Sequence, residues 1–298
     1  MSSGTVLIFE STIQKGQNTY LITLHTEDCT DYYPDMFRYS VKIDMNGVTK
    51  AVFRTNTYEY SPTVPLEAES VARHRFDEWE SRLKNDPSGF IGYLEKMQER
   101  IDKMYMPYDG DLFDVIVIQG SPRPDGNCSI LAGWIVDISE NLKKTVSVVY
   151  LDDMNIHPCI GCYQCYNYGY CVFADDMREI IEKVSRCSLL VVCSPVYTNT
   201  VPGTLKLCID RFQAYHAMNT FLEMEHNPGG MMIGVCGRKG KENFRGLTPV
   251  IDAFMGNCGI RNKGRVLIDN IDELHDIRKR KDLRMKIEGV MNDAFLSL

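Results

Sequence analysis

Four cysteines within thirteen residues are the strongest candidates for chemistry in this sequence. They are Cys159, Cys162, Cys165 and Cys171, spaced as C-x2-C-x2-C with the fourth cysteine six positions later. Thiolates are soft ligands, and three of them on one tight turn are typical of one side of an iron–sulfur cubane, which a fourth thiolate can complete. Because disulfides are rare in a reducing compartment, this spacing indicates a metal site or redox chemistry.

Three other interpretations of the cysteine group stay open. Tetrahedral zinc usually takes two separated cysteine pairs rather than a triplet with one follower. The cysteines could also act as redox thiols or as a disulfide without a cluster, or they could be reduced structural thiols. We expect the four tyrosines between and beside them to shield the site from water. These are Tyr163, Tyr166, Tyr168 and Tyr170.

A second candidate is the loop at residues 120–129, which follows an apolar stretch and leads into a predicted helix. Its small residues let the backbone curl around an anion, and the helix N-terminus offers free N–H groups and a partial positive charge. Arg123 can add a charge-assisted hydrogen bond. The loop matches neither Gly-x-Gly-x-x-Gly nor the Walker A pattern. It predicts phosphate binding, and the alternative is an ordinary turn with a helix cap.

The composition is that of a soluble globular protein. Hydrophobic residues make up 44% and charged residues 24% of the 298 positions, which excludes a disordered chain. No apolar run approaches the roughly 18 residues needed to cross a bilayer, and the N-terminus lacks the pattern of a secretory signal, so we expect a cytoplasmic protein. The net charge of −7 argues against a general binder of nucleic acid or of anionic membranes.

The first part of the chain predicts a small α+β domain over residues 1–110, whose role the sequence does not indicate. Apolar and alternating runs predict strands, and Asn46-Gly47 predicts a tight hairpin. Helical periodicity follows Pro65, and a linker is expected at 105–110. The predicted strands are Thr5–Phe9, Tyr20–Thr23, Phe37–Met45 and Val48–Phe53.

Residues 111–298 predict a parallel sheet with helices on both faces, because apolar strands alternate with helical segments. Ligands of such sheets bind beyond the carboxyl ends of the strands, where the strand order reverses. The predicted strands are Val115–Gln119, Val146–Leu151, Leu189–Cys193, Met231–Cys236 and Val266–Ile268. The predicted helices are Ser129–Leu142, Asp176–Ser185, Gly203–Tyr215, Phe244–Met255 and Ile271–Phe295.

These motifs together resemble a known family. Gly-Ser-Pro-Arg-x-x-Gly-Asn at 120–127 is similar to the FMN phosphate loop of NADPH-dependent FMN reductases, which have a flavodoxin-like fold. Ser-Pro-Val-Tyr-Thr-Asn at 194–199 and Ile-Asp-Arg at 209–211 resemble that family's flavin-ring loop and the helix after it. The cysteine group resembles the iron-sulfur flavoprotein branch, which holds one [4Fe-4S] cluster beside FMN. The resemblance extends over roughly residues 115–211.

The resemblance implies a set of site residues. The FMN phosphate is expected at Ser121, Arg123, Asn127, Cys128 and Ser129. The isoalloxazine ring is expected beside Pro195, Val196, Tyr197 and Thr198. The [4Fe-4S] ligands are expected to be Cys159, Cys162, Cys165 and Cys171. The basic loop at 236–241 departs from the family pattern, and its Arg238 or Lys239 could neutralise the flavin or attract a nucleotide phosphate.

The leading hypothesis is an oxidoreductase that uses FMN and a [4Fe-4S] cluster to pass electrons between two-electron and one-electron partners. The alternatives are an NAD(P)H-dependent FMN or quinone reductase without a cluster, a non-enzymatic electron carrier, and a flavin sensor. The expected partners are NAD(P)H as donor and a ferredoxin-like protein or a small molecule as acceptor, in a homodimer or homotetramer. The sequence indicates no catalytic acid or base.

Overall fold

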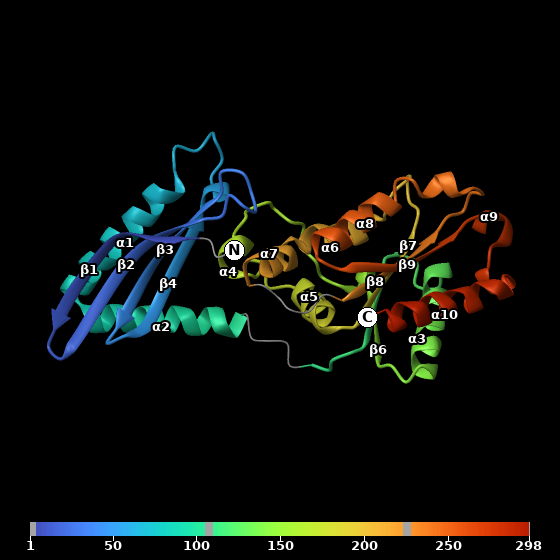
Figure 1. The fold of residues 1–298 in the computed structure, drawn as a ribbon, viewed down its shortest axis with the longest axis horizontal. Coiled ribbons are helices and arrows are strands. Elements are labelled where there is room, and N and C mark those ends of the chain that lie inside the picture. Colours follow the sequence, from blue (N-terminus) through green and yellow to red (C-terminus); the bar gives the residue numbers. More distant parts are fainter. Residues whose placement is uncertain (1–3, 105–109, 223–227, 298) are drawn as a thin grey trace. The chain divides into compact units, whose positions relative to one another are not determined.

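The computed structural model describes residues 4–104, 110–222 and 228–297, and the chain divides into two compact units (Figure 1). The first unit combines Met1–Pro107 with Ile160–Val172, and the second combines Tyr108–Cys159 with Phe173–Leu298. The segment around the cysteines thus belongs to the first unit although the flanking chain belongs to the second. Residues 105–109 of the predicted linker at 105–110 lie outside the described residues.

The first unit contains an antiparallel sheet of four strands in the order β1-β2-β3-β4. The strands are β1 (Thr5–Lys15), β2 (Asn18–Asp28), β3 (Phe37–Met45) and β4 (Val48–Asn56). The predicted hairpin is confirmed, since Asn46 and Gly47 join β3 to β4 with φ angles of 51° and 81°. The first two strands are longer than predicted because their backbone pairing continues through polar residues that carry no apolar signal.

One face of this sheet carries the core of the first unit. Alternate residues of β2 and β3 point inward and are buried, as a strand's period of two requires. They pack against α1 (Ala68–Asn85), and α2 (Pro87–Met104) follows it after a break at Asp86-Pro87. The buried residues that α1 contributes are Ala68, Ala72, Phe76, Trp79 and Leu83.

The second unit contains a parallel sheet of five strands in the order β6-β5-β7-β8-β9. Numbered along this unit, the order is 2-1-3-4-5, which confirms the predicted flavodoxin-like fold. The strands are β5 (Val115–Gln119), β6 (Val146–Tyr150), β7 (Leu189–Pro195), β8 (Gly229–Val235) and β9 (Arg261–Ile268). The helices between them are α3 (Asn127–Asn141), α5 (Met177–Arg186), α6 (Gly203–Arg211), α7 (Gln213–Leu222), α8 (Thr248–Asn257) and α10 (Lys281–Leu296).

The two faces of the parallel sheet carry separate cores. One face packs against α3 and α10, and the other packs against α5, α6, α7 and α8. The strand residues alternate between the two cores, as Met231 and Met232 of β8 do. Because α3 leaves β5 toward one face and α6 leaves β7 toward the other, the chain opens a crevice at the carboxyl ends of these neighbouring strands.

Two predicted helices are interrupted in the structure, so those predictions were wrong in their extent. The segment predicted as Gly203–Tyr215 breaks at Phe212 into α6 and α7. The segment predicted as Ile271–Phe295 contains α9 (Ile271–Leu274), η4 (Ile277–Lys279) and α10. Here His275 has a φ of 60°, which an α-helix cannot continue through, and Asp276 caps the following turn with its side chain.

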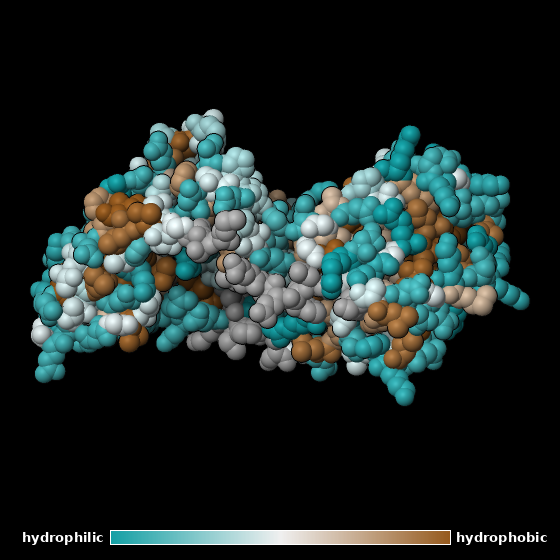
Figure 2. All heavy atoms as spheres, in the orientation of Figure 1, coloured by the Kyte–Doolittle hydropathy of each residue, from teal (hydrophilic) through white to brown (hydrophobic). Residues whose placement is uncertain are grey.

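None of the helices in the described parts of the chain has the length and apolarity that a membrane span requires. Hydrophilic residues cover most of the visible surface of each unit, with smaller apolar areas between them (Figure 2).

The hairpin between β3 and β4 leads to a prediction about stability. Gly47→Ala should lower the free energy of unfolding by about 1–2 kcal/mol, because an L-residue is strained at a φ of 81°. Gly92→Ala is the matched control, since Gly92 lies inside α2 and a Cβ added to it meets no other atom. Alanine at this position should raise the free energy of unfolding by about 0.5–1 kcal/mol. Urea unfolding of both variants measures the difference, and shifts of the same sign would contradict the role assigned to Gly47.

Candidate functional site

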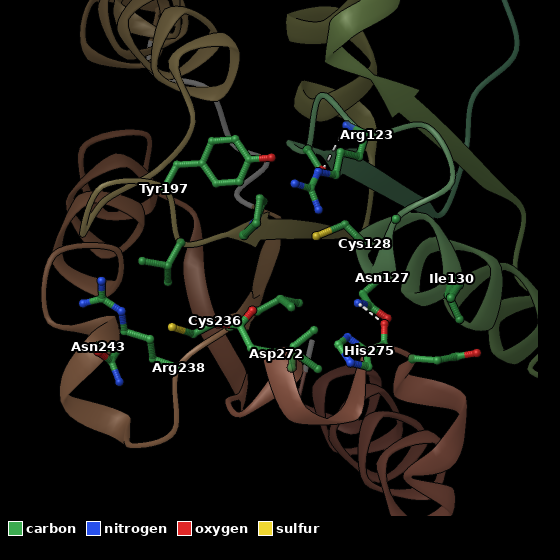
Figure 3. A pocket seen from close by; sticks show the side chains of 18 of the residues that line it. Arg123, Asn127, Cys128, Ile130, Tyr197, Cys236, Arg238, Asn243, Asp272 and His275 are labelled. Atoms are coloured by element: carbon green, nitrogen blue, oxygen red, sulfur yellow. Dashed lines mark hydrogen bonds between the residues drawn. The ribbon is translucent and has the colours of Figure 1, made fainter.

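The carboxyl edge of the parallel sheet contains a cavity of about 760 Å³ (Figure 3). Its walls come from the segments that follow β5, β7, β8 and β9. Parallel strands end at the same edge of a sheet, so four loops far apart in sequence meet there. Residues 151–159 and 173–176, which follow β6 in the same unit, do not line this cavity.

Gln119, the last residue of β5, organises the first wall of the cavity. Its side chain is fully buried, its Oε1 accepts from the backbone N–H of Ser121 at 2.6 Å, and its Nε2 donates to Ser129 Oγ at 2.9 Å. Ser121 Oγ in turn accepts from the N–H of Arg123 at 3.2 Å. Gln119 was not predicted as a site residue, although a polar amide at the end of an apolar buried strand is a usable signal.

The same wall presents positive charge to the cavity. Helix α3 begins after Gly126, which has no side chain to cap the first N–H groups, and the helix dipole adds partial positive charge at that end. Arg123 from this loop and Arg238 from the loop after β8 also line the cavity (Figure 3). Neither guanidinium forms an ion pair with any described residue. Two unpaired arginines and a helix N-terminus together favour an anionic group.

Asn127 lies in the cavity wall but its amide already has partners. Its Nδ2 donates to the carbonyl of His275 at 3.3 Å, and its Oδ1 accepts from the N–H of Ile277 at 3.0 Å (Figure 3). Asn127 therefore ties the start of α3 to the turn after β9. Its backbone N–H, at the first position of the helix, is the group best placed for an anion.

The wall after β7 presents an aromatic side chain and a tight turn. Tyr197 is 37% exposed, and its backbone pairs with Thr200 in both directions at 2.9 Å. Thr198 and Asn199 have φ angles of 45° and 63°, so this turn is held in a conformation that few residues adopt. The carbonyl of Asn199 approaches Gly246 so closely that no Cβ fits there. The loop is therefore fixed by backbone packing before any ligand binds.

The turn after β9 forms a wall that the sequence did not predict. Asp272, His275, Asp276 and Arg278 line the cavity, and Asp276 pairs with Arg278 at 2.7 Å. Hydrogen bonds from Arg278 lower the pKa of Asp276 to about 2, so the carboxylate is ionised at neutral pH. No motif marks this turn, because the sequence there reads as part of a long helix.

Eight of the nine predicted cofactor-binding residues line the cavity, and Ser129 does not. Ser129 Oγ instead accepts from Gln119 and donates to the carbonyl of Arg123 at 3.4 Å, so Ser129 supports the loop from behind. The lining residues are Ser121, Arg123, Asn127, Cys128, Pro195, Val196, Tyr197 and Thr198.

A buried ion pair in the second unit holds together the residues that flank the cysteine-rich stretch 160–172. Arg211 of α6 donates to Asp175 Oδ2 at 2.6 Å, to Asp175 Oδ1 at 2.8 Å and to the carbonyl of His157 at 2.7 Å. The side chains of Arg211 and Asp175 are 1% and 3% exposed. Asp175 also accepts from the N–H of His157 at 2.9 Å. The Arg211 guanidinium thus binds both His157, which precedes the cysteine-rich stretch, and Asp175, which follows it.

The four predicted metal ligands are divided between the two units, since Cys159 belongs to the second and Cys162, Cys165 and Cys171 belong to the first. Among the described residues, no three side chains of the types His, Cys, Asp or Glu lie where they could hold one metal ion. Cys159 is exposed, while Cys162, Cys165 and Cys171 are partly exposed, and none forms a disulfide. The donor chemistry of four thiolates at this spacing suits an iron–sulfur cluster.

Four of the other cysteines behave as core residues. Burial raises the pKa of Cys187 and Cys258 to about 12, and burial followed by repulsion from Glu27 raises that of Cys29 to about 11. A hydrogen bond with Cys128 and burial together raise the pKa of Cys193. These thiols stay protonated at neutral pH, so they are poor nucleophiles and poor metal ligands.

The comparisons with known proteins agree with the motifs. The sequence model of the NADPH-dependent FMN reductase family matches residues 113–261, which is half of the chain. An iron-sulfur flavoprotein of Methanocaldococcus jannaschii is 31% identical over 126 residues, covering 42% of this chain and 64% of that protein. An iron-sulfur flavoprotein of Methanosarcina thermophila is 30% identical over 122 residues, covering 41% of this chain and 62% of that protein. The chain thus spans less than two thirds of the length of either relative.

A solved NAD(P)H:quinone oxidoreductase from Methanothermobacter marburgensis superposes with a TM-score of 0.47 and 15% identity, over 60% of this chain and 94% of that one.

The buried ion pair predicts a large loss of stability on Asp175→Asn. The change leaves the buried Arg211 guanidinium without a counter-charge, which costs about 3–5 kcal/mol of unfolding free energy. Asp252→Asn is the matched control, because Asp252 pairs with Arg265 on the surface and such pairs contribute about 0–1 kcal/mol. Urea unfolding at pH 7 measures both, and equal losses would show that burial adds nothing to the Asp175–Arg211 pair.

The same pair predicts the direction of the pH dependence. Burial raises the pKa of Asp175. Hydrogen bonds from Arg211 and His157 and the charge of Arg211 lower this pKa by more than burial raises it, so it lies below its usual value. The stabilisation is therefore complete at neutral pH and is lost as the pH falls below about 4, the unfolded value. Asp175→Asn should remove this part of the acid sensitivity.

Proposed function

The chain belongs to the NADPH-dependent FMN reductase family, and from this premise we propose that it is an FMN-dependent oxidoreductase. The single observation that carries the proposal is the cavity at the carboxyl edge of β5, β7, β8 and β9, with a helix N-terminus and two unpaired arginines at its wall. The volume of about 760 Å³ lies within the range of cofactor pockets, roughly 300–1,000 Å³.

We assign the two ends of FMN to opposite walls. The phosphate would bind at the start of α3, where Ser121, Arg123, Asn127 and Cys128 line the cavity. The isoalloxazine ring would lie against residues 195–198, where Tyr197 offers an exposed aromatic face. Arg238, from the loop at 236–241 that is more basic than the family pattern leads us to expect, is available for the flavin or for a nucleotide phosphate.

The protein's own contribution is binding, orientation and charge. FMN supplies the capacity to accept an electron pair and to release electrons singly. Gln119 fixes the conformation of the loop at 120–129 through its hydrogen bonds to Ser121 and Ser129. The backbone N–H groups of this loop are therefore oriented before the phosphate binds. Asn127 ties this loop to the turn after β9. No described side chain is assigned as a general acid or base.

We further propose that Cys159, Cys162, Cys165 and Cys171 bind a [4Fe-4S] cluster, which would carry single electrons. The spacing, the exposure of these thiols and the names of the relatives support this assignment. The second candidate is an NAD(P)H-dependent FMN or quinone reductase without a cluster, as the family name of the matching model suggests. Iron and acid-labile sulfide in anaerobically purified protein separate the two, and zinc with neither rejects the cluster.

The proposed donor is NAD(P)H, and the acceptor is a ferredoxin-like electron-transfer protein or a small molecule. A cytoplasmic location and a homodimer or homotetramer complete the proposal. Anaerobic mixing of the FMN-loaded protein with NADH or NADPH should bleach the flavin absorbance. Reduction by reduced ferredoxin without bleaching by either nucleotide would replace the reductase by an electron carrier.

The phosphate assignment predicts that Arg123→Ala weakens FMN binding. Loss of one charge-assisted hydrogen bond should weaken the binding free energy of FMN by about 1.5–3 kcal/mol and raise its dissociation constant accordingly. Arg284→Ala is the control, because Arg284 pairs with Asp137 at the surface away from the cavity lining. Flavin fluorescence titration measures both constants, and an unchanged value for Arg123→Ala removes this residue from the phosphate site.

The cluster assignment predicts that Cys162→Ser abolishes cluster assembly while FMN stays bound. A hydroxyl is a much poorer ligand for iron than a thiolate, and Cys162 does not line the flavin cavity. Cys187→Ser controls for loss of a thiol outside the group. Iron, sulfide and FMN content per chain are the measurements, and full iron content in Cys162→Ser would contradict the ligand assignment.

A further inference from the structure

The cysteine segment folds with the first unit rather than with the flavin-binding unit. Residues 160–172 join Met1–Pro107 in one compact body. Three of the four cysteines, Cys162, Cys165 and Cys171, therefore lie in a loop whose surroundings are supplied by the first 107 residues. We call residues 160–172 the cysteine loop.

A buried amide pair fixes the middle of the cysteine loop. Asn56, the last residue of β4, is fully buried and donates from Nδ2 to Asn167 Oδ1 at 2.8 Å and to the carbonyl of Tyr163 at 3.1 Å. Asn167 is 3% exposed and donates from Nδ2 to Glu59 Oε1 at 2.6 Å. The same Glu59 oxygen accepts from the backbone N–H of Asn56 at 2.8 Å. The three side chains form a closed network between β4, η1 (Thr57–Glu59) and the loop.

Further contacts hold the short helix α4 (Cys165–Tyr168) within the cysteine loop. Arg38 Nη1 of β3 donates to the carbonyl of Tyr166 at 2.8 Å, and the hydroxyls of Tyr33 and Tyr166 lie 2.5 Å apart. Tyr168 Oη accepts from the backbone N–H of Arg54 at 3.1 Å. Two of the tyrosines predicted to shield the cysteines, Tyr166 and Tyr168, thus contact Tyr33, Arg38 and Arg54, and Tyr166 is buried.

The backbone of the cysteine loop needs this support. Gly161, Tyr163 and Gly169 have φ angles of 64°, 54° and 78°, so the chain adopts the left-handed conformation three times within nine residues. Tyrosine is unfavourable in that region, and such conformations persist only where the surroundings enforce them. The carbonyl of Tyr163 is the one that Asn56 binds.

We propose that the first unit is the scaffold of the cysteine loop, and that Asn56, Glu59 and Asn167 are positioning residues for its metal loading. Flavin binding is independent of them, because none of the three lines the flavin cavity. The scaffold claim stands on the contacts above, and the metal-loading claim rests on the cluster in the proposed function. Together they give the N-terminal domain a role that its own residues do not reveal.

The first test measures thiol alkylation in the full-length, metal-free protein. Asn167→Ala removes the loop side of the network and leaves the sheet intact, and Asn56→Ala removes the sheet side. Both should accelerate alkylation of Cys162, Cys165 and Cys171 by iodoacetamide about tenfold, the factor that corresponds to about 1.4 kcal/mol. Cys159 is already exposed and serves as the internal reference in peptide mass mapping. Thr49→Ala, which removes an exposed hydrogen bond to Asp44 at the other end of β4, is the control.

The second test measures iron, acid-labile sulfide and FMN after anaerobic reconstitution with ferrous iron and sulfide. Asn167→Ala and Glu59→Ala should lose most of the iron and keep FMN at the wild-type level. Glu59→Gln should keep the iron, because its amide oxygen still accepts from Asn56 and Asn167. Parallel loss of iron and FMN would indicate general misfolding, and failure of Glu59→Gln to keep the iron would show that the hydrogen bonds of residue 59 are not what the loading requires. Either result would overturn the positioning role.

The outcomes separate this inference from the proposed function. Wild-type alkylation rates in Asn167→Ala and Asn56→Ala would overturn the scaffold claim whatever the iron content. Absence of iron from the reconstituted wild type would reject the cluster and the metal-loading claim, while the alkylation rates would still decide whether the first unit holds the loop.

Discussion

The parallel register of β5, β7, β8 and β9 is the constraint on which the cavity proposed for FMN depends. Pairing of Gln119 with Cys193, and of Pro195 with Val235 and Val235 with Ile268, brings the carboxyl ends of these strands to one edge. The helices that follow β5 and β7 leave toward opposite faces, so the edge opens into a cavity instead of closing. Burial of the apolar strands stabilises this arrangement, so the loops can carry polar groups without loss of the fold. The position of the cavity is therefore determined by the strand pairing in the sheet.

The sequence was sufficient to predict those parts of the site that depend on local patterns. Apolar runs indicated the five strands, and small and polar residues indicated the loop at 120–129, whereas the loop at 194–199 was identified by its resemblance to a family motif. Two features were not predictable in this way. The direction of Ser129 is set by Gln119, and the wall at 271–278 exists because His275 interrupts what reads as one helix. Both depend on contacts or backbone angles that residue spacing does not encode.

The cysteine segment illustrates the same limit over longer distances. Its spacing predicted metal chemistry, but its partners are separated from it by more than a hundred positions, as Asn56 is from Asn167. Such pairs form only in the folded first unit, and the hydrophobic pattern of neighbouring residues does not predict them. The base of the segment is closed by Asp175 and Arg211 in the second unit, whereas its body packs with the first. The lining of the cavity and the cysteine loop thus belong to different units of the chain.

The central claim is that the cavity recognises the phosphate of FMN through the start of α3 and its arginines. The most direct test compares the dissociation constants of FMN and riboflavin for the flavin-free protein, since the two ligands share the ring and differ in the phosphate. Charge-assisted bonds contribute about 1.5–3 kcal/mol each, so riboflavin should bind at least about 100-fold more weakly than FMN. Equal constants for the two flavins would contradict the claim, because the anion would then contribute nothing to binding.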